Sequence, residues 1–175
     1  MHDVCPKRKT NRLKQFDYSQ NGAYFITICT HNRKEILSQI NVGDGSPVPK
    51  LTIYGDIVLK LINEISNKYP NVIVDKYVIM PNHIHIILAI INHNGTGDPS
   101  PTISNIVAWL KYTSTKEMNS LKKSAGTRIF QRSFYDHIIR NEADYLNIWQ
   151  YIEDNPLKWH DDKYYTGDDK NGFDG

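Results

Sequence analysis

Residues 80–90 read Met80-Pro81-Asn82-His83-Ile84-His85-Ile86-Ile87-Leu88-Ala89-Ile90, and the rest of the chain is organised around them. From Ile84 onward the stretch is almost wholly apolar and rich in isoleucine, which predicts a buried strand. Side chains alternate faces along a strand, so His83 and His85 point the same way, roughly 6.6 Å apart at a rise of about 3.3 Å per residue. Two imidazoles on one face of a rigid strand can bind one metal ion. The alternative is a strand end whose histidines hydrogen-bond water or backbone carbonyls.

Length and composition indicate one globular domain. The chain of 175 residues is 39% hydrophobic, which is enough for a substantial core. No apolar run approaches the roughly 20 residues that a membrane span requires, and residues 1–6 lack the apolar core of a signal peptide. The two cysteines, Cys5 and Cys29, make no disulfide framework. We therefore expect a cytoplasmic protein without a membrane segment.

The net charge of +2 is unevenly distributed. Residues 7–14 contain five Lys and Arg, whereas the last sixteen residues hold five Asp and two Lys. A basic arm attracts polyanions without reading sequence, although a merely solvated tail has the same composition. We expect a basic arm over residues 1–20, a folded domain over residues 21–160 and an acidic, flexible tail over residues 161–175.

Periodicity and turn residues predict an α+β fold. Strands are expected over residues 24–30, 72–80 and 83–90, a strand or hairpin arm over 128–140, helices over 54–69, 102–121 and 141–155, and loops over 41–50 and 92–101. The first six strands and helices follow a split βαβ pattern, which gives a four-stranded antiparallel sheet with two helices on one face. The other face is free to carry a site beneath the added C-terminal helix.

The last predicted helix has an apolar face, and Tyr151 lies outside it. One side of its helical wheel carries Tyr145, Ile148, Trp149 and Ile152. Tyr151 falls outside this stripe, on a narrow polar line with Asp144 and Asn155, because residues four apart are neighbours on a helix. A tyrosine on the polar face is not placed for core packing, although a surface tyrosine covering apolar side chains would show the same pattern.

If this helix lies over the free sheet face, Tyr151 comes close to the two histidines. Asn155, one turn on, could add an amide oxygen, and such a donor set suits Mg²⁺ or Mn²⁺ holding a phosphate oxygen. The metal would act as a Lewis acid at phosphorus. A phenol has an ordinary pKa near 10, so it needs a metal or a base to attack at neutral pH. Tyr151 is then the predicted nucleophile, and the product is a phosphotyrosine ester.

These residues resemble a known family. His83-Ile84-His85 resembles the His-hydrophobic-His motif of the IS200-like single-tyrosine transposases, a group of HUH nucleases. Residues 130–141, Phe-Gln-Arg-Ser-Phe-Tyr-Asp-His-Ile-Ile-Arg-Asn, and the Tyr-Ile-x-x-Asn-Pro ending at residues 151–156 are similar to its REP-associated tyrosine transposase branch. The similarity runs from about residue 24 to residue 159. It implies a ferredoxin-like fold and a metal-dependent enzyme that cleaves and rejoins single-stranded DNA at hairpin-associated sites.

The resemblance also implies roles for single residues. The metal histidines of the family match His83 and His85, and its nucleophile matches Tyr151. Asn155 stands where insertion-sequence members carry a Gln, and its reach is shorter, so a water could bridge it to the metal. His137 matches a family position and is expected either to orient the site or to be a hydrogen-bonded structural histidine.

Family substrates fold as imperfect hairpins with a flanking recognition tetranucleotide, so we expect basic side chains to contact DNA phosphates. The candidates are Arg12, Lys14, Arg33, Lys34, Lys111 and Arg132. Tyr135 and Tyr145 are rival nucleophiles. They rank below Tyr151 because the first lies on a predicted strand and the second faces the core.

Two other functions stay open at the level of sequence. A non-catalytic nucleic-acid-binding module of the same fold could use sheet aromatics such as Tyr24 and Phe25. A zinc hydrolase could take His137 or His31 as its third ligand, but the sequence has no His-Glu-x-x-His helix and no paired Cys motif. The protein is expected to be a monomer or a homodimer, according to whether the tyrosine helix packs on its own chain or across a two-fold axis.

Overall fold

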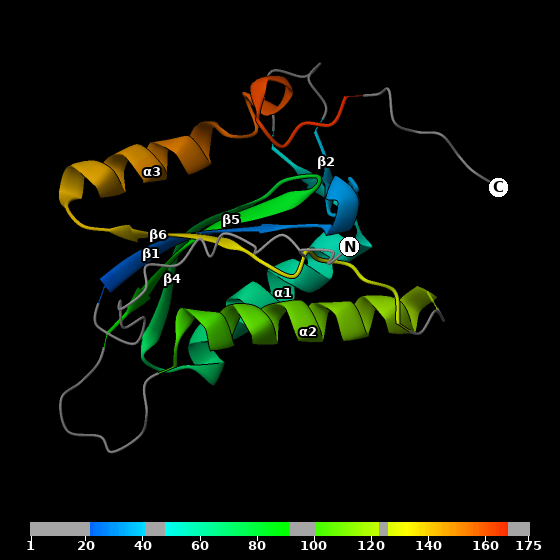
Figure 1. The fold of residues 1–175 in the computed structure, drawn as a ribbon, viewed down its shortest axis with the longest axis horizontal. Helices are drawn as coiled ribbons and strands as arrows, with labels where there is room; N and C mark the ends of the chain where they lie inside the picture. The colour runs from blue at the N-terminus through cyan, green and yellow to red at the C-terminus, as the bar shows by residue number, and fades with distance from the viewer. Residues whose placement is uncertain (1–21, 41–47, 92–100, 123–125, 168–175) are drawn as a thin grey trace, which may run out of the picture.

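The main sheet has four strands in the order β4-β5-β1-β6, within a computed structural model that describes residues 22–40, 48–91, 101–122 and 126–167. The strands are β1 (Gly22–Cys29), β4 (Val72–Ile79), β5 (His83–Ile90) and β6 (Tyr135–Ile139), and every neighbouring pair is antiparallel. Helices α1 (Ile53–Lys68) and α2 (Ile103–Lys122) cover one face, and α3 (Glu142–Asp154) lies on the other (Figure 1). The predicted α+β fold with a split βαβ core and an added helix is confirmed.

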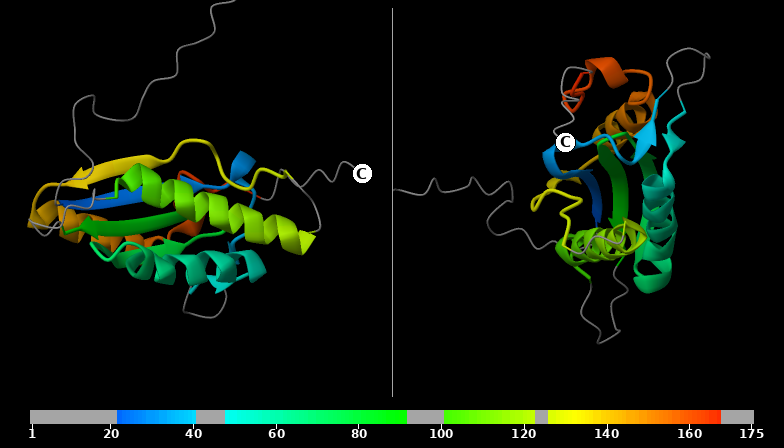
Figure 2. Two further views of the ribbon diagram at one scale, coloured as in Figure 1. Left: turned by 90° about the horizontal axis from the view of Figure 1, so that it is seen from below. Right: turned by 90° about the vertical axis from the view of Figure 1, so that its right-hand side faces the viewer.

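The main core lies between the sheet and the helix pair α1 and α2. Alternate residues of β1 and β5 point into it, because successive side chains of a strand face opposite ways. Its buried members include Tyr24, Ile26, Ile28, Ile84, Ile86 and Leu88 from the sheet, and Leu61, Ile65, Ile106 and Leu110 from the helices. Figure 2 shows the two helices side by side across this face. Each fully buried aliphatic side chain contributes about 1.5–3 kcal/mol to this packing.

A smaller apolar cluster attaches α3 to the opposite face, where Phe25 and Ile87 pack against Ile152. The predicted apolar stripe of this helix, with Tyr145, Ile148 and Trp149, packs half-buried around that cluster. Polar contacts fix the helix to β4 as well: the Tyr145 hydroxyl donates to Asp75 Oδ2 at 2.6 Å. Lys76 of β4 pairs with Glu153 and lies 3.9 Å from the centroid of the Trp149 ring. The helix that carries Tyr151 is therefore held at several points along its length.

The last strand is shorter than predicted. β6 begins at Tyr135, and before it the chain makes one isolated bridge between Phe130 and Thr30 instead of the strand expected from residue 128. Phe130 packs into the main core. The Lys111 ammonium of α2 donates to the backbone carbonyls of Gln131 and Arg132, so these carbonyls do not extend the ladder with β1. Alternation of apolar and polar residues could not show this interaction.

Two further segments differ from expectation. A small sheet pairs β2 (Ser38–Gln39) with β3 (Lys50–Leu51), so the predicted 41–50 loop ends in a strand. Residues 161–167, predicted to start a flexible tail, begin at the last residue of the short helix η2 (Trp159–Asp161). This helix and the residues after it pack against the sheet, with Trp159 and Tyr164 buried. The predicted arm over 1–20 and the other loop and tail residues lie outside the described ranges. Within those ranges no helix has the length and apolar character to cross a membrane.

Candidate active site

His83 and His85 of β5 lie side by side on the sheet face beneath α3, as the alternation predicted. Both side chains are fully buried, and their ring centroids are 4.5 Å apart. Asn82 donates through Nδ2 to the Tyr164 carbonyl at 2.7 Å, so its Oδ1 accepts from His83 Nδ1 at 2.9 Å. The proton of His83 is thereby assigned to Nδ1. Its Nε2 is buried and has no hydrogen-bond partner among the described residues. The lone pair of this nitrogen is therefore available to bind a metal ion.

The second imidazole is oriented by β1 and faces α3. Thr27 Oγ1 lies 2.9 Å from His85 Nδ1, and His85 Nε2 lies 3.3 Å from the Tyr151 hydroxyl oxygen. Burial lowers the pKa of His85 well below its usual value, and the neighbouring His83 lowers it further. Burial likewise lowers the pKa of His83, to about 4. Both rings are therefore neutral near pH 7, and a neutral imidazole is the form that binds metal ions.

Tyr151 reaches this pair from α3. Its ring centroid is 5.1 Å from that of His85 and 6.0 Å from that of Phe25, and its side chain is 38% exposed, so it opens to solvent on one side. Burial raises the pKa of its hydroxyl, and the nearby Asp162 charge raises it further. The phenol is thus protonated in the metal-free protein. The tyrosine helix packs on its own chain, so one polypeptide brings all of these groups together.

Asn155 and Asp162 complete the cluster. Asn155, the C-cap of α3, is buried and donates through Nδ2 to Asp162 Oδ2 at 2.9 Å, while its Oδ1 has no partner among the described residues. The Tyr164 amide donates to Asp162 Oδ1 at 2.6 Å and fixes the carboxylate. One ligand atom each from His83, His85 and Asp162 lie within 4.8 Å of one another. Two imidazoles and a carboxylate so close together form a donor set that suits a divalent cation.

Sequence reasoning missed Asp162, because it lies in an acidic run beyond Pro156 that was interpreted as a tail. A signal was present: the same run carries Trp159, Tyr164 and Tyr165, and such aromatics are unusual in a solvated tail. In the structure the Trp159 and Tyr164 ring centroids lie 6.0 Å and 4.6 Å from that of His83. These aromatics hold Asp162 at the histidine pair.

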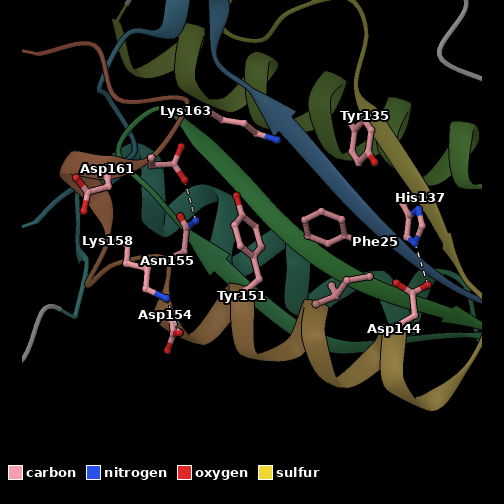
Figure 3. A pocket seen from close by; sticks show the side chains of 12 residues that line it. Phe25, Tyr135, His137, Asp144, Tyr151, Asp154, Asn155, Lys158, Asp161 and Lys163 are labelled. Atoms are coloured by element: carbon pink, nitrogen blue, oxygen red, sulfur yellow. Dashed lines mark hydrogen bonds and ion pairs between the residues drawn. The ribbon is translucent and has the colours of Figure 1, made fainter.

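An open cavity of about 500 Å³ adjoins the cluster (Figure 3). Tyr151, Phe25 and Tyr135 line its middle, Asn155 lies at one end, and His137 and Asp144 lie at the other. Asp162 is hydrogen-bonded to Asn155 and also lines the cavity. The predicted His137 is thus in the cavity but not in the cluster: its Nε2 lies 2.9 Å from Asp144 Oδ2. The same cavity holds Tyr135, whereas Tyr145 is turned to Asp75 on β4.

The predicted basic residues are found in different environments. Arg33 and Arg132 line a second cavity with His31, so His31 does not join the histidine pair. Lys34 is exposed, and Lys111 is committed to two backbone carbonyls. Arg12 and Lys14 lie outside the described residues. The contacts of these six residues with DNA stay predictions.

Comparison with known proteins finds relatives that cover most of the chain. A Haemophilus influenzae protein of uncharacterised function is 35% identical over 174 residues, covering 91% of this chain and 93% of its own length. A second protein of that organism, described as a REP-associated tyrosine transposase, is 26% identical over 150 residues, covering 81% of this chain and 74% of its own. In fold the chain resembles a REP-associated tyrosine transposase solved with a REP hairpin, with a TM-score of 0.60 at 22% identity over 85% of this chain and 74% of that one.

The family itself is established by the sequence. Residues 18–155 match the family described as "Transposase IS200 like", and this span contains the histidine pair, Tyr151 and Asn155. The resemblance that the motifs suggested is therefore confirmed over most of the chain. This protein belongs to the IS200-like transposase family and is similar to its REP-associated tyrosine members.

Proposed function

We propose that the protein is a metal-dependent single-stranded DNA transesterase that cleaves and rejoins DNA through a covalent bond to Tyr151. One observation carries the proposal: the Tyr151 hydroxyl oxygen lies 3.3 Å from Nε2 of His85, beside a second buried imidazole whose Nε2 has no partner in the described part of the chain. A phenol at a histidine pair suits nucleophilic attack on phosphorus. Membership of a transposase family supports DNA as the substrate.

The residues present fit a divalent cation. His83 and His85 are neutral and buried, Asp162 supplies a negative charge, and Asn155 Oδ1 is a buried oxygen without a partner among the described residues. We assign these four as the groups that hold the metal, with Mg²⁺ or Mn²⁺ favoured by the oxygen donors. When bound, the cation polarises a phosphate oxygen and favours the phenolate form of a nearby tyrosine.

In the chemical step Tyr151 Oη attacks the phosphorus of a DNA phosphodiester. A bond forms between Oη and phosphorus, the bond from phosphorus to the 3′ oxygen breaks, and that oxygen takes up a proton as the 3′ hydroxyl leaves. The phenol releases one proton, so protons balance. The 5′ phosphate is then esterified to Tyr151, and attack by a 3′ hydroxyl reverses the step without ATP. α3 holds the phenol in place, and Thr27 and Asn82 fix the imidazoles.

The substrate that we propose is a single strand flanked by an imperfect hairpin. Support comes from the solved relative of the same fold, which is bound to a REP hairpin. The open cavity beside Tyr151 is walled by aromatic rings, on which unpaired bases stack. Arg12 and Lys14 on the proposed arm over residues 1–20 would add contacts to phosphates.

The test is a covalent adduct. Protein incubated with a labelled REP-type hairpin carrying a single-stranded flank, with Mn²⁺ or Mg²⁺, should give a labelled band that survives denaturing electrophoresis. Tyr151→Phe should abolish the band while DNA binding survives. The matched controls Tyr145→Phe and Tyr135→Phe should retain it, because the Tyr145 hydroxyl is bonded to Asp75 and the Tyr135 ring packs against Phe25, whereas the Tyr151 hydroxyl lies at His85.

The same experiment separates the other two functions. If the protein were a non-catalytic binding module, replacing His83 and His85 by Ala would leave all of its activity intact. A zinc hydrolase predicts cleaved DNA without a tyrosine ester. An adduct that persists in Tyr151→Phe would refute the nucleophile assignment.

A further inference from the structure

A second cavity, of about 590 Å³, lies beyond the end of β1, and the chemistry proposed above does not use it. It is lined by His31, Asn32, Arg33, Arg128, Gln131 and Arg132. This lining holds three arginines and no carboxylate. Several guanidinium groups around one cavity, without an acidic residue in the lining to neutralise them, favour an anionic ligand.

Arg33 connects this cavity to the histidine pair. Its guanidinium carbon lies 4.5 Å from the centroid of the Tyr164 ring, and that ring lies 4.6 Å from the ring of His83. The Tyr164 ring therefore contacts both Arg33 and His83, although it lines neither cavity. Arg33 Nη1 is buried and has no hydrogen-bond partner in the described ranges, although arginine donors inside proteins are normally paired.

The backbone that presents Arg33 is strained. Asn32 and Arg33 have φ values of 54° and 53°, in the left-handed region that side chains other than Gly rarely adopt. Such residues cost on the order of 1–3 kcal/mol each and persist where neighbouring contacts fix them. Here His31 donates from its amide to the Ile129 carbonyl at 2.7 Å, and Thr30 Oγ1 donates to the Lys34 carbonyl at 2.8 Å. Strain held in this way is typical of a functional loop.

The opposite side of the cavity is shaped by Lys111. Its ammonium donates to the carbonyls of Gln131 and Arg132, which are both lining residues. Lys111 is thus a positioning residue: it holds the backbone carbonyls of residues 131–132, while the Gln131 amide donates to the Cys29 carbonyl of β1 at 2.9 Å. Its own charge is directed to these carbonyls.

We propose that this arginine cavity binds a phosphodiester group of the single strand next to the phosphate that Tyr151 attacks. The inference rests on the proposed function, which places the scissile phosphate at the histidine pair, one tyrosine ring away from Arg33. A guanidinium fork donates two parallel hydrogen bonds to a phosphate, and three guanidinium side chains line this cavity. Arg128 and Arg132 add charge at the rim, and Asn32 and Gln131 offer amides to the adjoining sugar or base.

The experiment measures binding without cleavage, in protein that carries Tyr151→Phe. The probe is a fluorescein-labelled oligonucleotide of about twelve thymidines, and its anisotropy is followed over a range of NaCl concentrations. Arg33→Gln should weaken binding about tenfold and lower the slope of log K against log salt by about 0.7, the loss of one phosphate contact on a single strand. The affinity of Arg33→Lys should lie between those of the parent protein and Arg33→Gln, since lysine keeps the charge and loses the two-pronged guanidinium group.

Two further variants keep the test decisive. Lys116→Gln removes one charge from the exposed side of α2, on the helix-covered side of the sheet, and should change affinity less than twofold. Arg128→Gln with Arg132→Gln leaves the contact with Tyr164 intact and should also weaken binding, so it serves if Arg33→Gln fails to fold. If these arginine variants lose no more affinity than Lys116→Gln, the cavity is not a phosphate site. If protein with Tyr151 in place forms no adduct, the proposed function is refuted instead. The comparison of DNA affinities among the arginine variants would still be valid in that case.

Discussion

The two faces of the main sheet differ in the side chains that they bury, and β5 contributes residues to both. Its even-numbered residues Ile84, Ile86 and Leu88 point toward α1 and α2 and are at most 1% exposed in a continuous apolar core. Its odd-numbered residues His83 and His85 are equally buried but are surrounded by hydroxyl, amide and carboxylate groups. Burial alone therefore does not distinguish packing from chemistry. The difference lies in the side-chain chemistry: Ile84, Ile86 and Leu88 carry no polar side-chain atom, whereas the histidines carry ring nitrogens, of which His83 Nε2 has no partner among the described residues.

The largest effect should come from the site face. His85→Ala removes one imidazole and the group that faces Tyr151, so adduct formation should fall at least about a thousandfold, as expected when a reacting constellation loses a metal ligand. The measurement is the rate of covalent adduct formation with Mn²⁺, alongside Mn²⁺ affinity by calorimetry. His137→Ala is the matched control, since this histidine pairs with Asp144 and should leave Mn²⁺ affinity unchanged.

The adjacent residue on the same strand should behave in the opposite way. Ile86→Ala opens a cavity in the main core and should lower the free energy of unfolding by about 2–5 kcal/mol in urea titrations. Mn²⁺ affinity of the molecules that stay folded should not change, because Ile86 points away from the histidine pair. Ile73→Ala on β4, where the side chain is 47% exposed, should cost less than about 1 kcal/mol. Comparable losses at both positions would remove the distinction between the faces.

The faces should also differ in their response to acid. His83 has a folded-state pKa of about 4 against a usual value of 6.5, chiefly because it is buried. Between these values the unfolded chain binds a proton that the folded chain excludes, so stability is lost as pH falls from 6.5 toward 4. This one group contributes about 3 kcal/mol over that window. His83→Gln should flatten the pH profile of metal-free protein in urea titrations, and an unchanged profile would contradict the assignment.

A smaller effect should follow from the carboxylate. Asp162→Asn keeps the shape of the side chain and removes its charge, so Mn²⁺ affinity measured by calorimetry should fall about 10- to 100-fold. Asp161→Asn is the control: the neighbouring residue carries the same charge but is exposed and is not part of the cluster. Equal losses in the two variants would mean that Asp162 acts only as a distant charge.

The site residues that could be predicted from the sequence are those whose direction local periodicity determines. The two-residue alternation of β5 was enough to place His83 and His85 on one face, and the helical wheel was enough to set Tyr151 apart from the apolar stripe of α3. Asn155 followed from its position one turn later. These residues belong to regular elements whose geometry fixes the direction of each side chain.

The rest depended on contacts between distant segments. Asp162 reaches the histidines because Trp159 and Tyr164 pack against them, and no local pattern in an acidic run encodes that packing. Before β6, Lys111 of α2 binds the carbonyls of Gln131 and Arg132, and Gln131 lies twenty residues further along the chain. Periodicity describes a segment and its own face, whereas these two features arise only when separate segments meet.

The attachment of α3 has a consequence for how DNA ends could be exchanged. Asp75 and Lys76 of β4 fix the helix through Tyr145 and Glu153, and Asn155 fixes its last turn through Asp162. These contacts are spread along α3, and they hold the Tyr151 hydroxyl 3.3 Å from His85 Nε2. If α3 keeps these contacts, a DNA end esterified to Tyr151 would stay beside the histidines. The second DNA end would then have to reach the site by motion of the nucleic acid itself.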